Sequence, residues 1–241
     1  MTRMPGFGTG VSSVIGHRRQ IIDLAGEIER RGFSLISCPS SGDCVAMAQS
    51  ILHATGSIAV MAAVQPIYHR LPLSLAETGA HIHEVSGGRF RLGIGVGHAL
   101  SNKSYGIEPG RPLEDCRAYV AALRAAAEGS GPQPPIVMAA LRGRMFDLAV
   151  EIADGVVTSR ACRMHLAARV ARIPAERRDA GFIVANSIPT VIDDDPAVAL
   201  EVIRQSQAFY AGLENYRNYW RSVGYVEEMD AVEAALARGE Q

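Results

Sequence analysis

The chain has 241 residues, of which 48% are hydrophobic, and its 25 acidic and 24 basic side chains leave a formal net charge of −1. This length suits one large domain or two small ones, and the apolar fraction is enough for a sizeable core. The balanced charge gives no electrostatic case for binding nucleic acid or an anionic membrane. Because no stretch approaches 18 uninterrupted apolar residues and the first ten residues lack the apolar run of a signal peptide, we expect a cytoplasmic protein without a membrane span.

The cysteines and histidines do not form a recognisable metal site. No cysteine belongs to a CxxC pair or lies beside a histidine at metal-ligand spacing, so we expect buried, reduced thiols. His81 and His83 form an HxH pair, but side chains two apart on a helix point in different directions, and no metal is predicted. The four cysteines are Cys38, Cys44, Cys116 and Cys162.

Strand-like and helix-like segments alternate along the chain. In chain order we predict a first strand within Phe7–Ile15, helix Arg18–Arg31, strand Gly32–Cys38, helix Asp43–Ala54, strand Ser57–Val64, helix Pro72–Val85, strand Arg89–Val96, helix Pro112–Ala127, strand Pro135–Ala139, helix Arg142–Ala153, strand Gly155–Thr158, helix His165–Asp179, strand Phe182–Ile192, helix Pro196–Tyr210 and a helical tail Leu213–Arg238.

These strands are continuous apolar runs, which is typical of a parallel sheet covered by helices. The pattern predicts an α/β fold, and both a doubly wound sheet and a (β/α)8 barrel agree with it. The length is close to that of a compact barrel. No linker or change of composition divides the chain, so we predict a single domain over residues 1–241.

The stretch RLGIGVGHALSNKSYG, residues 91–106, ends a predicted strand with three alternating glycines. A dinucleotide fingerprint needs a further glycine three residues after the second, at the start of a helix. Counted from Gly93, that position is His98, and we expect a loop rather than a helix to follow. Either the glycines let helices pack closely on the sheet, or they let the strand end approach a flat ring at the face where barrels keep their active sites.

Five segments of the chain carry a family resemblance. They are PIYHRLPLSLAE (66–77), SGGRFRLGIGVGHA (86–99), GRPLEDCRAYVAALRA (110–125), PPIVMAALRGRMFDLAVEIADGVV (134–157) and LENYRNYWRSVGYVEE (213–228). Together they resemble the luciferase-like superfamily of bacterial flavin- and deazaflavin-dependent oxidoreductases, and the resemblance covers roughly residues 18–228. The last segment, which is helical, is similar to one in an actinobacterial subgroup associated with coenzyme F420.

The resemblance implies a TIM-like (β/α)8 barrel that binds F420 or FMN at the C-terminal ends of its strands. Only about seven strands can be placed, so we expect the barrel to be shortened or incomplete at its C-terminal end. Ala63 and Val64 lie where relatives have a bulge with a cis peptide bond against the ring of the cofactor. Ser40 stands where relatives often carry an acidic residue that faces the ring, and serine has no useful acid or base chemistry there.

Further candidate residues follow the third and fourth predicted strands. His98 stands where some relatives have an acidic proton donor, which makes it the candidate catalytic residue, because imidazole exchanges protons near neutral pH. It could also only hydrogen-bond the ring or a backbone carbonyl. Gly97, Ser101 and Asn102 are candidates for contacts with the ring edge, and His69 is the candidate residue on the substrate side.

Residues 139–145, AALRGRM, match the phosphate loop of the superfamily, in which backbone N–H groups at a helix start bind an anion. Arg142–Gly143 stands where subgroup members often have Gly-Pro. Arg142 and Arg144 either clamp a phosphate directly, or the bulk of Arg142 disturbs the loop. The cofactor-binding candidates here are Ala140, Leu141, Arg142, Gly143 and Arg144, with Thr158 from the next strand.

The resemblance implies an oxidoreductase that transfers a hydride between coenzyme F420 and a small organic substrate, with the cofactor supplying the redox chemistry. Basic residues near the phosphate loop favour F420, which has an acidic tail. One alternative is an FMN-dependent monooxygenase that uses molecular oxygen, and another is a non-catalytic flavin-binding barrel or partner subunit. We expect a homodimer whose ligand is a small molecule, with no nucleic acid, membrane or metal partner.

Overall fold

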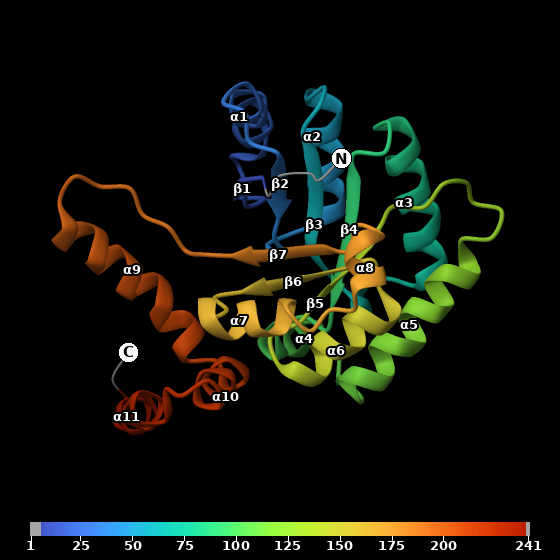
Figure 1. Ribbon diagram of the computed structural model, residues 1–241. Helices are drawn as coiled ribbons and strands as arrows, with labels where there is room; N and C mark the ends of the chain where they lie inside the picture. The colour runs from blue at the N-terminus through green and yellow to red at the C-terminus, as the bar shows by residue number, and fades with distance from the viewer. Residues whose placement is uncertain (1–5, 240–241) are drawn as a thin grey trace. The chain divides into compact units, whose positions relative to one another are not determined.

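The computed structural model describes residues 6–239 (Figure 1). Residues 1–5, part of the segment on which we based the absence of a signal peptide, lie outside the described residues. The strands are β1 Gly8–Gly10, β2 Leu35–Cys38, β3 Ala59–Pro66, β4 Phe90–Gly95, β5 Ile136–Ala139, β6 Gly155–Ser159 and β7 Ile183–Ser187. The helices are α1 Arg18–Arg30, α2 Cys44–Ala54, the 3-10 turn η1 Ile67–His69, α3 Pro72–Val85, α4 Ala99–Ser104, α5 Pro112–Ala126, α6 Gly143–Ile152, α7 Arg163–Val170, α8 Ala175–Asp179, α9 Pro196–Ala211, α10 Glu214–Ser222 and α11 Val226–Ala237.

Within residues 6–239, seven strands form one sheet in the order β1 to β7. The pairs from β1 to β6 are parallel, and at least one helix connects each strand to the next. A doubly wound sheet would reverse its strand order at a switch point, whereas here the spatial order follows the chain. The fold is therefore a TIM-like barrel with seven strands in place of eight, as the sequence predicted.

The described chain divides into two compact units. Of the described residues, unit 1 contains 6–140, Arg144–Val157 and Pro174–Ala185. Unit 2 contains Leu141–Gly143, Thr158–Ile173 and 186–239. That residues 1–241 act as a single domain stays a prediction.

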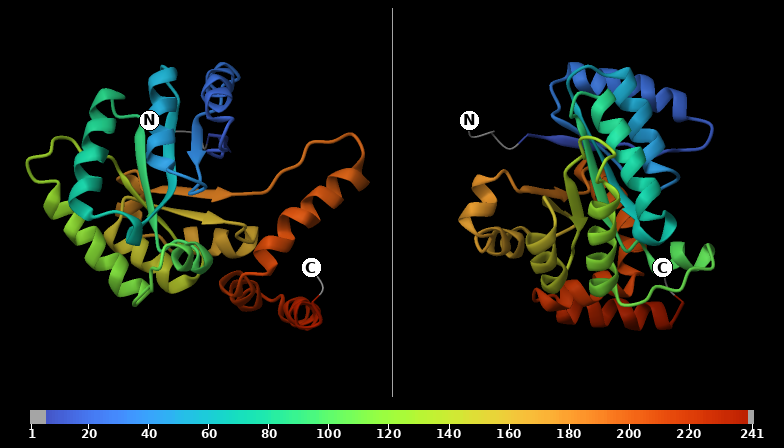
Figure 2. Two further views of the ribbon diagram at one scale, coloured as in Figure 1. Left: turned by 180° about the vertical axis from the view of Figure 1, so that it is seen from behind. Right: turned by 90° about the vertical axis from the view of Figure 1, so that its right-hand side faces the viewer.

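The core of unit 1 lies between the sheet and its helices. Figure 2 shows α1, α2 and α3 side by side along strands β2 to β4. Ile51 of α2 and Leu75 of α3 are fully buried, as are Val60 and Ile94 of the strands. Each such side chain contributes about 1.5 to 3 kcal/mol through removal of apolar surface from water. Buried residues occur on each of β2 to β6, which explains why these strands read as continuous apolar runs, whereas β1 and β7 have none.

Arg89 fastens the amino ends of β3 and β4 to the preceding helices. Its guanidinium donates to the carbonyl oxygens of Leu52, Thr55, Ile58 and Ser86 at 2.8 to 3.0 Å, and to the Thr55 hydroxyl at 3.2 Å. These bonds use all five N–H donors of an arginine. One side chain thus satisfies a carbonyl in the last turn of α2 and carbonyls of the segments between the helices and the strands.

Glu29 of α1 satisfies backbone N–H groups in the same region, as Arg89 satisfies carbonyl groups. Its carboxylate accepts hydrogen bonds from the backbone of Gly56, Ser57 and Ile58, just before β3, at 2.6 to 3.1 Å. Burial by itself would raise the pKa of Glu29, but these hydrogen bonds outweigh it and lower the pKa to about 2. The carboxylate therefore stays ionised well below neutral pH.

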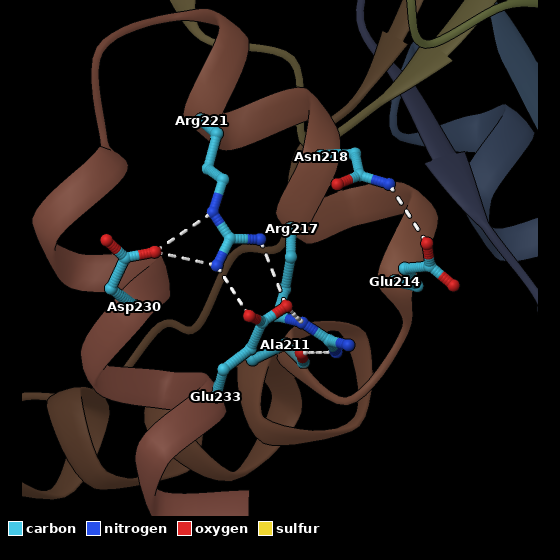
Figure 3. Close-up of polar contacts among 7 residues, drawn as sticks. All are labelled: Ala211, Glu214, Arg217, Asn218, Arg221, Asp230 and Glu233. Atoms are coloured by element: carbon cyan, nitrogen blue, oxygen red, sulfur yellow. Dashed lines mark hydrogen bonds and ion pairs between the residues drawn. The ribbon is translucent and has the colours of Figure 1, made fainter.

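Two arginines join the last helices of unit 2 (Figure 3). The Arg221 guanidinium lies between Asp230 and Glu233 of α11, at 2.8 Å from each. Arg217 donates to Glu233 at 3.0 Å and to the carbonyl oxygen of Ala211, at the end of α9, at 2.7 Å. Hydrogen bonds from the two arginines lower the pKa of Glu233 to about 2. Three helices are thus tied through one shared carboxylate and one carbonyl.

Three predicted segments run well past the residue at which the observed helix or strand ends. The single helix over 165–179 is wrong, because Pro174 precedes α8 and cannot continue α7. The strand predicted over 182–192 ends at Ser187, shortly before Pro189, which has no N–H for a sheet ladder. The tail is split between α10 and α11, where Gly224 adopts a φ of 106°.

The cysteines of the described residues are all free thiols. Cys38, Cys44 and Cys116 are buried as expected, whereas Cys162 is only half-buried. Burial raises the pKa of Cys38 to about 12 and that of Cys44 and Cys116 to about 11, so these thiols are unreactive at neutral pH. Among residues 6–239 no group of three His, Cys, Asp or Glu side chains could hold a metal ion. None of the helices in that range is long and apolar enough to cross a membrane.

We predict that Glu29→Gln lowers the free energy of unfolding by about 1 to 2 kcal/mol at pH 7, because a carboxylate is lost from three N–H groups. In the folded protein the pKa of Glu29 is lower than in the unfolded chain, where it is about 4.3. The carboxylate therefore contributes its full stabilisation when the pH is above the unfolded pKa, and this stabilisation is lost as the pH falls through the folded pKa. Thermal unfolding of both proteins between about pH 7 and pH 2 measures this. Glu77→Gln, at an exposed position, is the matched control. If the difference in stability between wild type and Glu29→Gln stays constant down to pH 2, the explanation is wrong.

Candidate active site

Most of the predicted site residues of unit 1 follow the carboxyl ends of neighbouring parallel strands. Ser40 follows β2, η1 with His69 follows β3, His98 and α4 follow β4, and Ala140 follows β5. Since parallel strands end at the same edge of a sheet, the fold brings these segments to one edge. We call His69, Gly97, His98, Asn102 and Tyr105, which follow β3 and β4, the β3–β4 rim.

Strand β3 carries one extra residue opposite β4. Ala62 pairs with Leu92 and Gln65 pairs with Ile94, so three steps along β3 match two along β4. The Ala63–Val64 peptide bond within this bulge is cis. Both the bulge and the cis bond, which the resemblance implied for this position, are confirmed.

Gly93 and Gly95 make room for the bulge. A Cβ atom on Gly93 would overlap the carbonyl oxygen of Ala62 and lie 3.2 Å from Val64. A Cβ atom on Gly95 would lie 2.8 Å from Ala139 of β5 and 3.0 Å from Val64. The interpretation that these glycines admit packing helices is therefore wrong, because the atoms that require glycine belong to the adjacent strands.

The third glycine turns the chain at the end of β4. Gly97 has a φ of 72°, and a side chain there would contact Pro66 and the Asn102 oxygen at 3.2 and 3.3 Å. The segment after it is not the expected loop, because α4 begins at Ala99. His98 immediately precedes this helix, and its carbonyl accepts the backbone N–H of Asn102 at 3.0 Å.

Asn102 is the most deeply buried polar residue of the β3–β4 rim, with 1% of its surface exposed. Its amide nitrogen donates to the carbonyl oxygen of Val96 at 2.9 Å. Its amide oxygen lies 3.0 Å from Nε2 of His69. The Tyr105 ring meets the His69 ring edge-on, with centroids 4.9 Å apart. Asn102 thus joins the end of β4 to the turn that follows β3.

The residues on both sides of His69 are also anchored. The Tyr68 hydroxyl donates to Asp115 of α5 at 2.6 Å, and burial and this carboxylate raise the pKa of Tyr68. Arg70 pairs with Asp43, which caps the start of α2, at 2.5 Å. The carbonyl of Arg70 accepts the Tyr119 hydroxyl at 2.9 Å. The His69 backbone is therefore held from α2 and from α5.

Among the other candidates of unit 1, His98 and Ser101 are half-buried and Ser40 is exposed. Arg144 is exposed and lines a shallow groove between α5 and α6 that also contains Glu114, Asp147 and Glu151. The catalytic role of His98 and the cofactor contacts of these residues stay predictions.

In unit 2 an arginine lies at the start of α6. A Cβ atom on Gly143 would overlap the guanidinium of Arg169. Arg169 Nε donates to Nε2 of His165 at 3.3 Å, so His165 carries its proton on Nδ1 and donates it to the Tyr219 hydroxyl at 3.2 Å. The Tyr219 oxygen also accepts the backbone N–H of Cys162 at 2.9 Å. Burial and the neighbouring Arg169 lower the pKa of His165, so its imidazole is neutral.

Our sequence analysis missed Arg169 and His165 and named Arg142 instead, whose side chain is exposed. The available signal was the spacing of four between a histidine and an arginine on a helix that follows a strand, which places them on one face. Thr158, another candidate, is buried and donates its hydroxyl hydrogen to Asn186 at 2.8 Å. That contact directs the Thr158 hydrogen toward the end of β7.

The model of one protein family, described as luciferase-like monooxygenase, matches residues 4–241. The chain belongs to this family. A 5,10-methylenetetrahydromethanopterin reductase from Archaeoglobus fulgidus is 33% identical over 109 residues, which are 37% of this chain and 33% of the relative. The matched part thus spans about a third of that relative's length.

Solved structures of luciferase-like proteins share the fold at low sequence identity. The coenzyme F420 dependent tetrahydromethanopterin reductase from Methanopyrus kandleri has a TM-score of 0.77 and 20% identity, over 98% of this chain and 80% of that one. An F420-dependent secondary alcohol dehydrogenase, in complex with an F420-acetone adduct, has a TM-score of 0.71 and 18% identity, over 87% and 75%. A type II Baeyer-Villiger monooxygenase from Pseudomonas putida, in complex with FMN, has a TM-score of 0.62 and 15% identity, over 98% and 80%.

We predict that Gly93→Ala destabilises the protein by about 2 kcal/mol or more, because the new methyl group overlaps the Ala62 carbonyl in the β3 bulge. Gly26→Ala on α1 is the matched control, and it should be neutral or stabilise by up to about 1 kcal/mol, since its Cβ has space and alanine favours helix. Urea unfolding of the three proteins measures both effects. Equal stability of Gly93→Ala and wild type would show that the bulge does not depend on this glycine.

Proposed function

We propose that this protein is an oxidoreductase that transfers a hydride between coenzyme F420 and a small organic substrate. The observation that carries the proposal is the Arg169 guanidinium at Gly143, the first residue of α6, in the loop that matches the phosphate loop of the family. A guanidinium beside backbone N–H groups at a helix start is suited to a phosphate group. The reductase and dehydrogenase described above, which use F420, support the choice of cofactor.

Each unit, considered separately, has residues suited to one chemical group of such a cofactor. In unit 1, Gly93 and Gly95 leave Val64 as the side chain over this part of the sheet, which suits a flat ring. In unit 2, the Nε of Arg169 donates to neutral His165, and the guanidinium lies against Gly143. When bound, F420 supplies the hydride chemistry.

His98 is the candidate for proton exchange with the substrate. It lies between Gly97 and the start of α4, with an extended backbone and a half-buried side chain. An imidazole in such a position can hold or release a proton near neutral pH. Ser40, which follows β2, has no comparable acid–base chemistry, so His98 is the stronger candidate.

An FMN-dependent monooxygenase is the second candidate function. The description of the matching family and the FMN complex of the Baeyer-Villiger enzyme favour it. FMN also carries a flat ring and a phosphate, so neither of these groups distinguishes it from F420. That the protein works as a cytoplasmic homodimer stays a prediction.

Calorimetric titration of the protein with F420 and with FMN tests the proposal. We expect F420 to bind with micromolar or tighter affinity and FMN to bind more weakly. His98→Ala should keep the affinity for F420 and lower turnover by about a hundredfold, the size of a general acid–base contribution. His53→Ala, on the exposed face of α2, is the control. Binding of FMN alone would move the assignment to the monooxygenase, and binding of F420 without turnover of any acceptor would indicate a non-catalytic barrel.

We predict that Arg169→Gln weakens the binding of either cofactor about tenfold, because one charge-assisted contact to a phosphate is lost. Arg163→Gln, exposed on the same helix, should leave the affinity unchanged. The same titration measures both variants. If Arg169→Gln binds as tightly as wild type, the phosphate does not bind beside Gly143.

A further inference from the structure

We infer that Asn102 is a positioning residue that fixes the His69 imidazole, so that Nδ1 of His69 accepts a hydrogen bond from a hydroxyl group of the substrate. The inference rests on the proposed function only in placing the substrate at the carboxyl ends of the strands. It assigns the substrate class, a small alcohol, and it gives the buried Asn102 side chain a role toward His69 instead of toward the cofactor.

The orientation of the Asn102 amide follows from its neighbour on β4. The carbonyl oxygen of Val96, 2.9 Å away, can only accept a hydrogen bond, so the amide nitrogen must face it. The amide oxygen therefore faces His69. Turning the amide by 180° would place its oxygen against the carbonyl oxygen of Val96, where neither oxygen has a hydrogen to donate.

The amide orientation in turn fixes the tautomer of His69. An amide oxygen can only accept, so Nε2 of His69, at 3.0 Å, must carry the proton. In the neutral imidazole the other nitrogen, Nδ1, then has a lone pair and no hydrogen. The Val96 carbonyl thus determines, through one buried side chain, which nitrogen of His69 is an acceptor.

Nδ1 of His69 is open to solvent. Within residues 6–239 no side chain donates a hydrogen bond to it, and no buried side-chain nitrogen or oxygen in that range lacks a partner. An unpartnered Nδ1 must therefore be accessible. It is an acceptor held in place at the β3–β4 rim without a protein donor.

The surroundings of His69 keep this acceptor preorganised and give it an apolar neighbour. Tyr68 and Arg70 are anchored to Asp115 and Asp43, and the Tyr105 ring stands edge-on to the imidazole. A rigid acceptor loses little entropy when it binds a donor. A hydroxyl group on an apolar body suits this arrangement, because the hydroxyl reaches Nδ1 while the body contacts Tyr105. A ketone or a carboxylate offers no donor to Nδ1.

Long-range ¹H–¹⁵N NMR of the histidine side chains, on the protein without and with the cofactor that the titration selects, tests the first step. We expect one tautomer for His69, with Nε2 protonated and Nδ1 unprotonated. In Asn102→Leu the two nitrogens should report a mixture of tautomers. A proton on Nδ1 in the wild-type protein would overturn the inference. Since this measurement needs no cofactor, it can succeed or fail independently of the proposed function.

A pair of probes that differ in one hydrogen-bond donor tests the second step. Cyclohexanol should shift the Nδ1 resonance of His69, whereas cyclohexanone, which has a similar shape and no donor, should not. His69→Gln keeps a donor for Asn102 and places no acceptor where Nδ1 lies. We expect this variant to unfold near the wild-type temperature and to bind cyclohexanol about tenfold more weakly, with unchanged affinity for cyclohexanone.

His69→Asn is the reciprocal variant. Its short amide can place an oxygen near the position of Nδ1 but does not reach Asn102, so it should keep part of the preference for the alcohol and unfold at a lower temperature. If cyclohexanol and cyclohexanone affect His69 equally in the wild-type protein, or if His69→Gln keeps the preference for the alcohol, the inference is wrong.

Discussion

The contact between the β3 bulge and β4 is the constraint on which the rest of the candidate site depends. The extra residue in β3 displaces Val64 toward β4, and only glycine at 93 and 95 leaves space for it. A side chain at either position would displace Val64 or its neighbours on β5. The positions of η1 and α4, and with them His69 and Asn102, follow from where β3 and β4 end. The same glycines thus keep both the sheet and the β3–β4 rim in register.

Hydrogen-bonding groups are satisfied differently at the two ends of the strands. At the amino ends, Arg89 and Glu29 saturate loop carbonyls and N–H groups, and all five donors of Arg89 are in use. This is an arrangement for stability, because each backbone group left without a partner would destabilise the fold. At the carboxyl ends the partners are arranged so that one acceptor, Nδ1 of His69, is left open. The division agrees with the general rule that barrels keep stability at one face and chemistry at the other.

The alternation of strands and helices could be predicted from the apolar runs, whereas the barrel and the bulge at Ala63–Val64 could be predicted only from the family resemblance. The reason for the glycines could not, because the atoms that exclude a side chain at Gly93 and Gly95 come from β3 and β5, which are distant in sequence. Asn102 was predicted as a contact to the edge of the cofactor ring, but its partners within the protein are a backbone carbonyl and a histidine 33 residues earlier, and no local pattern reports such contacts. Arg169 was missed for the same reason, since its relation to Gly143 depends on how two loops fold.

The two histidines that carry the proposals show how neighbouring groups decide what an imidazole does. Asn102 presents an acceptor to His69, so Nε2 holds the proton and Nδ1 faces solvent with a lone pair. Arg169 presents a donor to His165, so Nδ1 holds the proton, Nε2 orients a guanidinium, and no acceptor is left for a ligand. The same side chain is an acceptor for a ligand in unit 1 and a support for a cation in unit 2. Because an imidazole has only one proton to place when neutral, the group that binds one nitrogen determines the chemistry available at the other.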